Sequence, residues 1–269
     1  MPIPRIAFEQ LPADARRAVA DQTGTVHHTE TMTGGMNSSI ASVLHTGSGP
    51  VFVKGIPADH HQVDAQRREA AVAPLLPPSC PRLHWHIEAA GWSLLGYEVV
   101  HGRHADYAPG SADLELVEDA LTELQAVTAP ADLDIKEAAD RWKNYAPPNV
   151  LHYFRGTALL HTDFAPDNIL ITGGRARLVD WAWPTRGAAW IDPGALALRL
   201  MEAGHSVEDA LGFADRFPSW HDAEAGALAA FGMASAALWH EISEQSPAEW
   251  KQGMARHAAL LADHLAEGR

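Results

Sequence analysis

The chain has 269 residues, of which 46% are hydrophobic and 20% are charged. This composition is ordinary for a globular protein with one large domain or two lobes, so a disordered chain is not the expected state. The net charge of −14 is uneven, because residues 1–100 hold 7 Lys or Arg against 9 Asp or Glu, whereas residues 101–269 hold 13 against 25. An acidic field repels nucleic acid and favours a cationic partner, although it is as often only a solubility feature. We expect no nucleic-acid partner.

The cysteine content and the N-terminal residues indicate where in the cell the protein is expected. Cys80 is the only cysteine, which excludes an intrachain disulfide and a cysteine-rich zinc site and suits a reducing cytoplasm. The segment Met1–Arg5 has no basic stretch leading into an apolar core, and no run of about 18 apolar residues follows elsewhere. We therefore expect a cytoplasmic protein without a membrane span. The sequence contains 16 histidines, but pairs such as His27-His28 lack the spacing of a metal site and indicate surface or core positions.

The first third of the sequence alternates between helix and strand patterns. Ala-rich and polar stretches indicate helices, and β-branched runs between Gly, Pro and Ser indicate strands. In chain order the patterns predict a helix over 12–22, strands over 25–32, 40–46 and 51–56, a helix over 60–76, and strands over 83–90 and 92–100. The first two strands flank a loop that is rich in Gly and Ser. Lys54 falls in the third strand, on the side opposite Val51 and Val53.

The remainder of the chain is mainly helical. From residue 111 the leucines recur at three- and four-residue spacings. Helical patterns cover 114–124, 192–204, 206–217, 221–243 and 247–266. The chain is therefore expected to be of the α+β class, with a β-rich part over 1–100 and a helical part over 101–269. Such a division suggests two lobes with a ligand cleft between them.

Residues 161–180 gather the polar side chains that carry chemistry. His161, Asp163 and Asn168 lie in a polar loop between apolar runs, and Asp180 follows across the turn Gly173-Gly174. Phosphoryl transfer requires a carboxylate that accepts the proton of the acceptor hydroxyl, and oxygen ligands that hold Mg²⁺ against the phosphates. Asp163, Asn168 and Asp180 meet this requirement.

The motif His161-x-Asp163-x-x-x-x-Asn168, with Asp180 twelve residues later, resembles the catalytic loop and metal-binding aspartate of kinases. An Asp-Trp pair in place of Asp-Phe-Gly is similar to the aminoglycoside phosphotransferase and choline kinase branch. The resemblance implies a bilobal protein-kinase-like fold, with a β-rich N-lobe that has one main helix and a mainly helical C-lobe. It also implies that Asp163 is the catalytic base, that His161 shapes the loop, and that Asn168 and Asp180 bind Mg²⁺.

The same resemblance assigns nucleotide-binding residues in the first third. Lys54 is similar to the lysine that binds ATP phosphates, and Glu69 to its ion-pair partner. Backbone N–H groups and hydroxyls of the loop between the first two strands are expected to cover the phosphates. These residues are Gly34, Gly35, Asn37, Ser38 and Ser39. The backbone from Glu98 to Val100 is placed as the hinge that offers hydrogen bonds to adenine, with ATP as the nucleotide and GTP as an alternative.

Asp192 resembles the acidic residue that follows the metal-binding aspartate in this family. It has two interpretations: a brace for the catalytic segment, or a helix N-cap, because Asp before Pro is a common helix start. The two interpretations are compatible. The resemblance covers about residues 25–200, and residues 201–269 match only in being helical.

The functional expectation is transfer of the ATP γ-phosphoryl group to a hydroxyl of a small molecule. A cationic antibiotic or natural product, inactivated by the transfer, is favoured by the acidic helical part. Carboxylates that could meet such a cation are Asp113, Glu115, Glu118, Asp119, Glu123, Glu241, Glu244 and Glu249. Alternatives are a metabolic kinase of an amino alcohol, sugar or glycated amine, and a nucleotide-binding pseudokinase. The chain has no Ala-Pro-Glu segment and no long activation loop, which argues against a protein substrate.

Overall fold

The structure is a computed structural model that describes residues 3–32, 34 and 37–268. The chain divides into two compact units: Met1–His101 together with Val179–Ala182, and Gly102–Leu178 together with Trp183–Arg269. The sequence pattern suggested one boundary after residue 100. The return of residues 179–182 to the first unit is a long-range feature that no local pattern reveals. Among the helices of the described residues, none combines the length and apolar character that crossing a bilayer requires.

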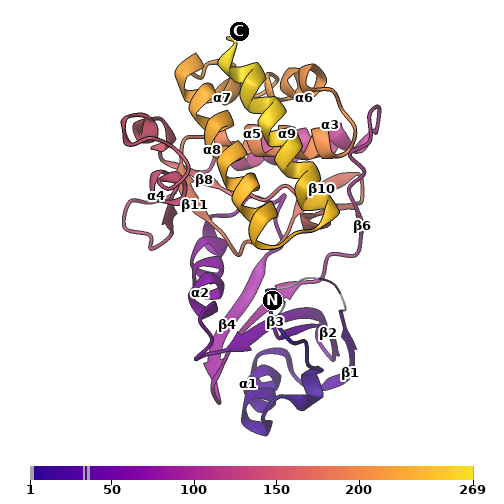
Figure 1. The fold of residues 1–269 in the computed structure, drawn as a ribbon. Helices are drawn as coiled ribbons and strands as arrows, with labels where there is room; N and C mark the ends of the chain where they lie inside the picture. Colours follow the sequence, from indigo (N-terminus) through magenta and orange to yellow (C-terminus); the bar gives the residue numbers. More distant parts are fainter. Residues whose placement is uncertain (1–2, 33, 35–36, 269) are drawn as a thin grey trace. The chain divides into compact units, whose positions relative to one another are not determined.

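An antiparallel sheet of five strands forms the first unit, in the order β1-β2-β3-β5-β4 (Figure 1). The strands are β1 (Val26–Thr31), β2 (Ile40–Thr46), β3 (Gly49–Pro57), β4 (Leu83–Ala89) and β5 (Trp92–Glu98). A two-residue turn joins β4 to β5, with positive φ angles of 49° at Ala90 and 80° at Gly91. A turn of this kind matches the twist of the strands it connects, so it fixes their register.

The two faces of this sheet have different roles. One face carries an apolar core that includes Leu44, Val51 and Val53 and packs against residues of the helix α1 (Ala13–Thr23). Lys54 points to the opposite face because successive side chains of a strand alternate. There it meets the helix α2 (Val63–Val72), which continues as a short 3₁₀ helix, Ala73–Leu75. The helix predicted over 60–76 is therefore shorter at both ends.

Helices dominate the second unit. They are α3 (Asp113–Gln125), α4 (Ala138–Trp142), α5 (Ile191–Glu202), α6 (Val207–Ala214), α7 (Pro218–His221), α8 (Ala225–Gln245) and α9 (Glu249–Ala266). The long helices α8 and α9 lie side by side and run in opposite directions (Figure 1). The helix predicted over 221–243 begins at Ala225 instead, because a separate short helix, Pro218–His221, precedes it.

Short strands of the second unit position the catalytic loop. The hairpin of β9 (Ile169–Thr172) and β10 (Arg175–Leu178) turns at Gly173-Gly174 and also pairs with β6 (Arg103–His104). A second small sheet has the order β7-β11-β8, from β7 (Lys136–Glu137), β11 (Thr185–Gly187) and β8 (Ala158–Leu160). The loop of residues 161–165 leaves β8, so its start is fixed by the pairing of β8 with β11.

Candidate active site

Lys54 lies at the centre of a buried charge cluster in the first unit. Its Nζ donates to Glu69 Oε2 at 2.8 Å and to Asp180 Oδ1 at 2.6 Å. The Tyr97 hydroxyl donates to the other oxygen of Glu69 at 3.0 Å. Burial opposes the charge of Lys54, but the two carboxylates outweigh it and raise the pKa of the lysine. The side chains of Lys54, Glu69 and Asp180 are therefore brought together from β3, α2 and the segment after β10.

The catalytic loop contains a strained residue. Thr162 has a φ angle of 67°, a conformation that β-branched residues rarely adopt. Asp192 of α5 holds the loop in place, because its carboxylate accepts the backbone N–H of His161 at 2.9 Å and that of Thr162 at 3.0 Å. Arg141 Nη1 donates to the Thr162 hydroxyl at 2.6 Å. The contacts of Asp192 match the bracing interpretation, whereas no side-chain cap bond forms at the start of α5.

Burial is the main influence on the pKa of Asp192. Removal of Asp192 from water raises its pKa to about 7, although the two backbone N–H groups and the charge of Arg141 act in the opposite direction. The carboxyl group is therefore close to its midpoint at neutral pH.

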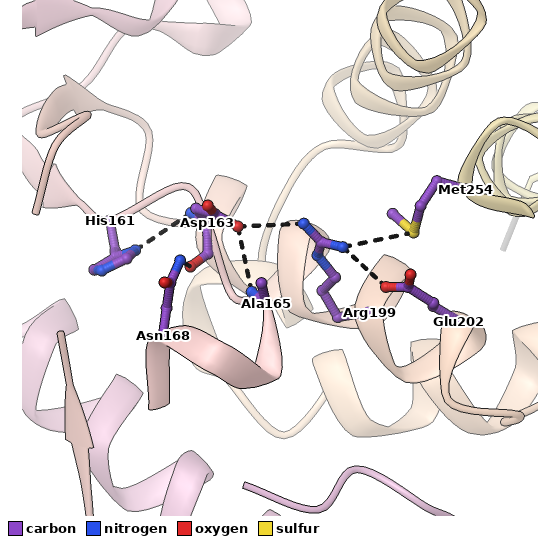
Figure 2. A network of polar contacts seen from close by, with 7 residues as sticks. All are labelled: His161, Asp163, Ala165, Asn168, Arg199, Glu202 and Met254. Carbon is purple, nitrogen blue, oxygen red and sulfur yellow. Dashed lines mark hydrogen bonds and ion pairs between the residues drawn. The ribbon is translucent and has the colours of Figure 1, made fainter. Parts of the chain in front are cut away.

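His161, Asp163 and Asn168 are adjacent in this loop (Figure 2). The backbone N–H of Asp163 donates to His161 Nδ1 at 3.3 Å, and Asn168 Nδ2 donates to the Asp163 carbonyl at 3.2 Å. Asp163 Oδ1 accepts from the Ala165 N–H and from Arg199 Nη2, both at 3.3 Å. Within the part of the chain that the structure describes, Asp163 Oδ2 has no hydrogen bond. One carboxylate oxygen is thus anchored and the other is available.

The sequence did not indicate Arg199 and Arg141, which contact the catalytic loop. Arg199 of α5 donates to Asp163 Oδ1 and to Glu202 Oε2, the latter at 2.9 Å (Figure 2). A signal for it was present, because Arg199 lies seven residues after Asp192 and so on the same helical face, among residues that are otherwise apolar. Arg141 lies in the five-residue helix α4, which has no periodic pattern that could have revealed it.

The loop before β2 differs in detail from the expectation. The carbonyl of Gly34 accepts from Arg5 Nη2 at 2.6 Å. The N–H of Ser39 donates to the Gly55 carbonyl at 2.8 Å, so that N–H is not available to a phosphate. Ser38 and Ser39 are buried, and Asn37 is half-buried. Gly35 lies outside the described residues, so its predicted phosphate contact is not addressed.

The backbone N–H groups at the two ends of the predicted hinge, Glu98 and Val100, differ in their hydrogen bonds. The N–H of Glu98 donates to the Arg82 carbonyl at 2.9 Å, and it is therefore not free to bind adenine. The backbone N–H of Val100, by contrast, makes no hydrogen bond to any described residue. Val100 follows the end of β5 and is half-buried. The hinge assignment therefore rests on Val100.

The donor atoms of Asn168 and Asp180 fit Mg²⁺ in their chemistry. Asn168 Nδ2 donates to the Asp163 carbonyl. The amide oxygen of Asn168 is therefore the atom that would bind a cation. The Asp180 side chain is 29% exposed and offers a carboxylate. Amide and carboxylate oxygens are ligands that Mg²⁺ prefers. Asn168 belongs to the second unit and Asp180 to the first, so their sharing of one ion stays a prediction. Among the described residues, no three His, Cys, Asp or Glu side chains cluster as a metal site.

Solved structures with the same architecture exist. A thermostable mutant of aminoglycoside phosphotransferase APH(4)-Ia, in a complex with ADP and hygromycin B, matches with a TM-score of 0.57 at 13% identity, over 94% of this chain and 99% of that one. Choline kinase LicA from Streptococcus pneumoniae matches with a TM-score of 0.57 at 14% identity, again over 94% and 99%. The chain has a protein-kinase-like fold.

A third solved structure has the same fold, whereas comparisons at the level of sequence find no match. A candidate fructosamine-3-kinase from Haemophilus somnus matches with a TM-score of 0.60 at 12% identity, over 92% of this chain and 96% of that one. No protein-family model matches the sequence, and a search of curated proteins gives no match. The protein-kinase-like fold, which the resemblance of residues 161–180 to kinases implied, is confirmed.

Proposed function

We propose that the protein transfers the γ-phosphoryl group of ATP to a hydroxyl of a small molecule, with Asp163 as the base. The observation that carries the proposal is the setting of this carboxylate. Asp163 lines a cavity of about 280 Å³ in the second unit, and its side chain is 41% exposed. One of its oxygens is anchored by Ala165 and Arg199. The other oxygen can accept a proton from a hydroxyl that is bound in the cavity.

The proposed step balances as follows. The acceptor oxygen forms a bond to the γ-phosphorus, and the bond from that phosphorus to the β,γ-bridging oxygen breaks. The bridging oxygen keeps the electron pair and leaves as part of ADP, while the hydroxyl proton passes to Asp163. A positioned base contributes typically about 10²–10⁴-fold to such a rate. Because one oxygen is anchored, the carboxylate is held in one orientation. This lowers the entropy cost of reaching the reactive geometry.

The charge cluster of the first unit supports nucleotide binding. Lys54 is the cation proposed to bind a phosphate oxygen, and Glu69 and Tyr97 keep its side chain in place. Mg²⁺, when it is bound, neutralises charge on the phosphates. Asn168 and Asp180 are the residues proposed to hold it. The hinge backbone at Val100 is the proposed adenine contact, with ATP preferred over GTP as the working hypothesis.

The biological role has two forms, inactivation of an antibiotic or phosphorylation of a metabolite. Among the structures with this fold, one contains hygromycin B and another is a choline kinase. The sequence favoured a cationic acceptor because the helical part is acidic. Several of those carboxylates are ion-paired, however: Asp113 with Arg103, Glu118 with Arg216, and Glu123 with Arg175. None of the eight predicted carboxylates lines the cavity, so the expectation of a cation loses its main support.

A pair of variants tests the reaction. Asp163→Asn keeps the size of the side chain but cannot accept the proton, so ADP release with an accepted substrate should fall by about 10²–10⁴-fold. ATP binding, measured by calorimetry, should change little. Asp167→Asn is the matched control, because Asp167 is four residues further along the loop and its side chain is 89% exposed. Wild-type turnover by Asp163→Asn would show that Asp163 is not the base.

A further inference from the structure

The cavity beside Asp163 has an unusual balance of charge for a site that would receive a cation. Its wall is formed by the loop of residues 162–164, by α4, α5, α8 and α9, and by Trp183. Five aromatic side chains contribute to it: Trp142, Phe164, Trp183, Phe231 and Trp239. Among the described lining residues Asp163 is the one carboxylate, whereas Arg141 and Arg199 are both present. The wall is therefore aromatic and carries two guanidinium groups.

The charge of Arg199 is already compensated. Its guanidinium contacts Glu202 at 2.9 Å and Asp163 at 3.3 Å. It also lies 5.4 Å from the ring centre of Trp239. Figure 2 shows this side chain extended between the two carboxylates. Arg199 is consequently a positioning residue for Asp163 and not a free cation for a ligand.

Arg141 differs from Arg199, because no carboxylate among the described residues forms an ion pair with it. Its hydrogen bonds all leave from Nη1, to Thr162 Oγ1 and Thr185 Oγ1 at 2.6 Å and to the Trp183 carbonyl at 3.4 Å. Nε and Nη2 donate to no residue that the structure describes. Burial lowers the pKa of Arg141 to about 10, so the group still carries its charge at neutral pH. Three N–H donors of a cavity-lining cation therefore have no partner among the described residues.

The free edge of Arg141 has the geometry of a carboxylate receptor. Nε and Nη2 of a guanidinium present parallel N–H groups that bind both oxygens of a carboxylate. Two indole rings flank the group, with the guanidinium carbon 5.0 Å from the centre of Trp142 and 5.9 Å from that of Trp183. Trp142 is 6% exposed, and its indole N–H is buried without a hydrogen bond in the described structure. An anion at this edge would gain N–H donors, whereas an amine would find no acceptor there. Asp192 and Asp163 attract the charge of Arg141 from a distance, but neither forms an ion pair with it among the described residues.

We infer that the acceptor is a hydroxylated carboxylic acid with a flat apolar body, whose carboxylate pairs with Arg141 and whose ring lies against the aromatic wall. This inference rests on the proposed function, because it concerns the acceptor of the same Asp163. The cavity volume of about 280 Å³ supports the class. A dry cavity of about 150 Å³ accepts benzene, so the present one has room for a substituted ring.

Three acceptors that share a hydroxymethyl-substituted ring and carry para groups of different charge test the inference on the full chain. They are para-(hydroxymethyl)benzoate, the neutral para-(hydroxymethyl)benzamide and the cationic para-(hydroxymethyl)benzylamine. Binding is measured by calorimetry and phosphoryl transfer by ADP release with ATP and Mg²⁺. The benzoate should bind about tenfold or more tightly than the amide, and the amine should bind weakest. Equal binding of the three compounds, tighter binding of the amine, or no binding of the benzoate at millimolar concentration would overturn the inference.

Variants at the edge of the cavity make the test specific to Arg141. Trp183→Glu places a carboxylate beside Arg141 and should remove the preference for the benzoate. Trp183→Gln loses the same ring without adding charge, and it should weaken all three compounds while keeping their order. Trp183 is 40% exposed, so both variants are expected to fold. Arg141→Gln should also remove the preference, and Arg175→Gln, at an exposed arginine paired with Glu123, should keep it. Retained preference in Trp183→Glu and Arg141→Gln would contradict the role of Arg141.

The two readouts separate this inference from the proposed function. Selective binding of the benzoate that Trp183→Glu removes, without ADP release from any compound, would support the acceptor class and contradict phosphoryl transfer. ADP release with the amine and not with the benzoate would support phosphoryl transfer and overturn the acceptor class. A role of Arg141 limited to holding Thr162 predicts lower turnover in Arg141→Gln with the order of binding unchanged, which would also overturn the inference.

Discussion

Lys54 is buried and has two anionic partners, so its removal should destabilise the protein strongly. In Lys54→Met the carboxylates of Glu69 and Asp180, whose side chains are 4% and 29% exposed, would lose their cation. Breaking a buried ion pair from one side costs about 3–5 kcal/mol in the free energy of unfolding. The double variant Lys54→Met/Glu69→Gln leaves one fewer buried charge and should recover about 1–3 kcal/mol of that loss. Urea denaturation of the three proteins measures both effects.

An exposed lysine provides the control for this cycle. Lys143 lies 3.8 Å from Asp140, and both side chains are more than half exposed. Lys143→Met should change the free energy of unfolding by no more than about 0.5 kcal/mol. If Lys54→Met is equally mild, the buried cluster is not held together by its charges, and the assignment of Lys54 as an anchored phosphate ligand loses its structural basis.

The site residues that the sequence could propose were those with a fixed spacing along the chain. Asp163 and Asn168 belong to one short loop, and Asp180 follows one hairpin later, so local geometry determines that they are candidates for one reaction. Arg141 contacts Thr162 across 21 residues, and Arg199 contacts Asp163 across 36. Such contacts depend on how α4 and α5 pack, which no local pattern encodes. The acceptor side of the site was accordingly the part least accessible from sequence.

At the scale of elements, the same distinction separates long periodic segments from short ones. The strand Ile40–Thr46 was predicted with its observed bounds, and the ends of the helices α3, α5 and α9 lie within two residues of the predicted ones. The strands β7, β8 and β11, of two or three residues each, were not predicted. A strand of that length is too short to show an alternating pattern in the sequence. It forms only because its backbone pairs with the neighbouring strands.

The helix α5 depends on one close approach. A methyl group on Gly194 would lie 2.6 Å from ring carbons of both Phe231 and Trp220. Gly194→Ala should therefore lower the free energy of unfolding by about 1–2 kcal/mol, because overpacking costs about 1–3 kcal/mol and helix propensity returns about 1 kcal/mol at most. Turnover should fall as well, since α5 carries Asp192 and Arg199. Denaturant unfolding and ADP release measure the two effects.

A glycine in another helix gives the matched control. At Gly253 of α9 the nearest atom to an added methyl group is Arg256 Nη2, at 3.8 Å. Gly253→Ala should stabilise the protein by about 0.5–1 kcal/mol, as expected for alanine in the interior of a helix with space around it. A stabilising effect of both substitutions would mean that α5 can move away from Phe231 and Trp220, and that its position does not fix the loop of Asp163.

For the whole molecule, the division into two units gives each its own polar cluster. Lys54, Glu69 and Asp180 belong to the first unit, and His161, Asp163 and Asn168 belong to the second. Because Val179–Ala182 packs with the first unit, the chain crosses between the units more than once, and the two are not independent pieces of sequence. Global unfolding should therefore report on groups in either unit.

The pH dependence of global stability tests the brace of the catalytic loop. Burial raises the pKa of Asp192 from 3.8 to about 7, so between these values the folded protein holds a proton that the unfolded chain has lost. The contribution of Asp192 is then fully present below about pH 4 and is lost as the pH rises through about 7, at about 1.4 kcal/mol per pH unit. Asp192→Asn cannot lose this proton. It should be less stable than the wild type at low pH by about 1–3 kcal/mol, because one backbone N–H loses its acceptor. Since the wild type then loses about 1.4 kcal/mol per pH unit and the variant does not, the difference should fall to zero and change sign before the pH reaches neutrality. Urea unfolding of both proteins across this range measures the difference. If the variant instead becomes less stable relative to the wild type as the pH rises, Asp192 is ionised in the folded protein and the charge of Arg141 outweighs its burial.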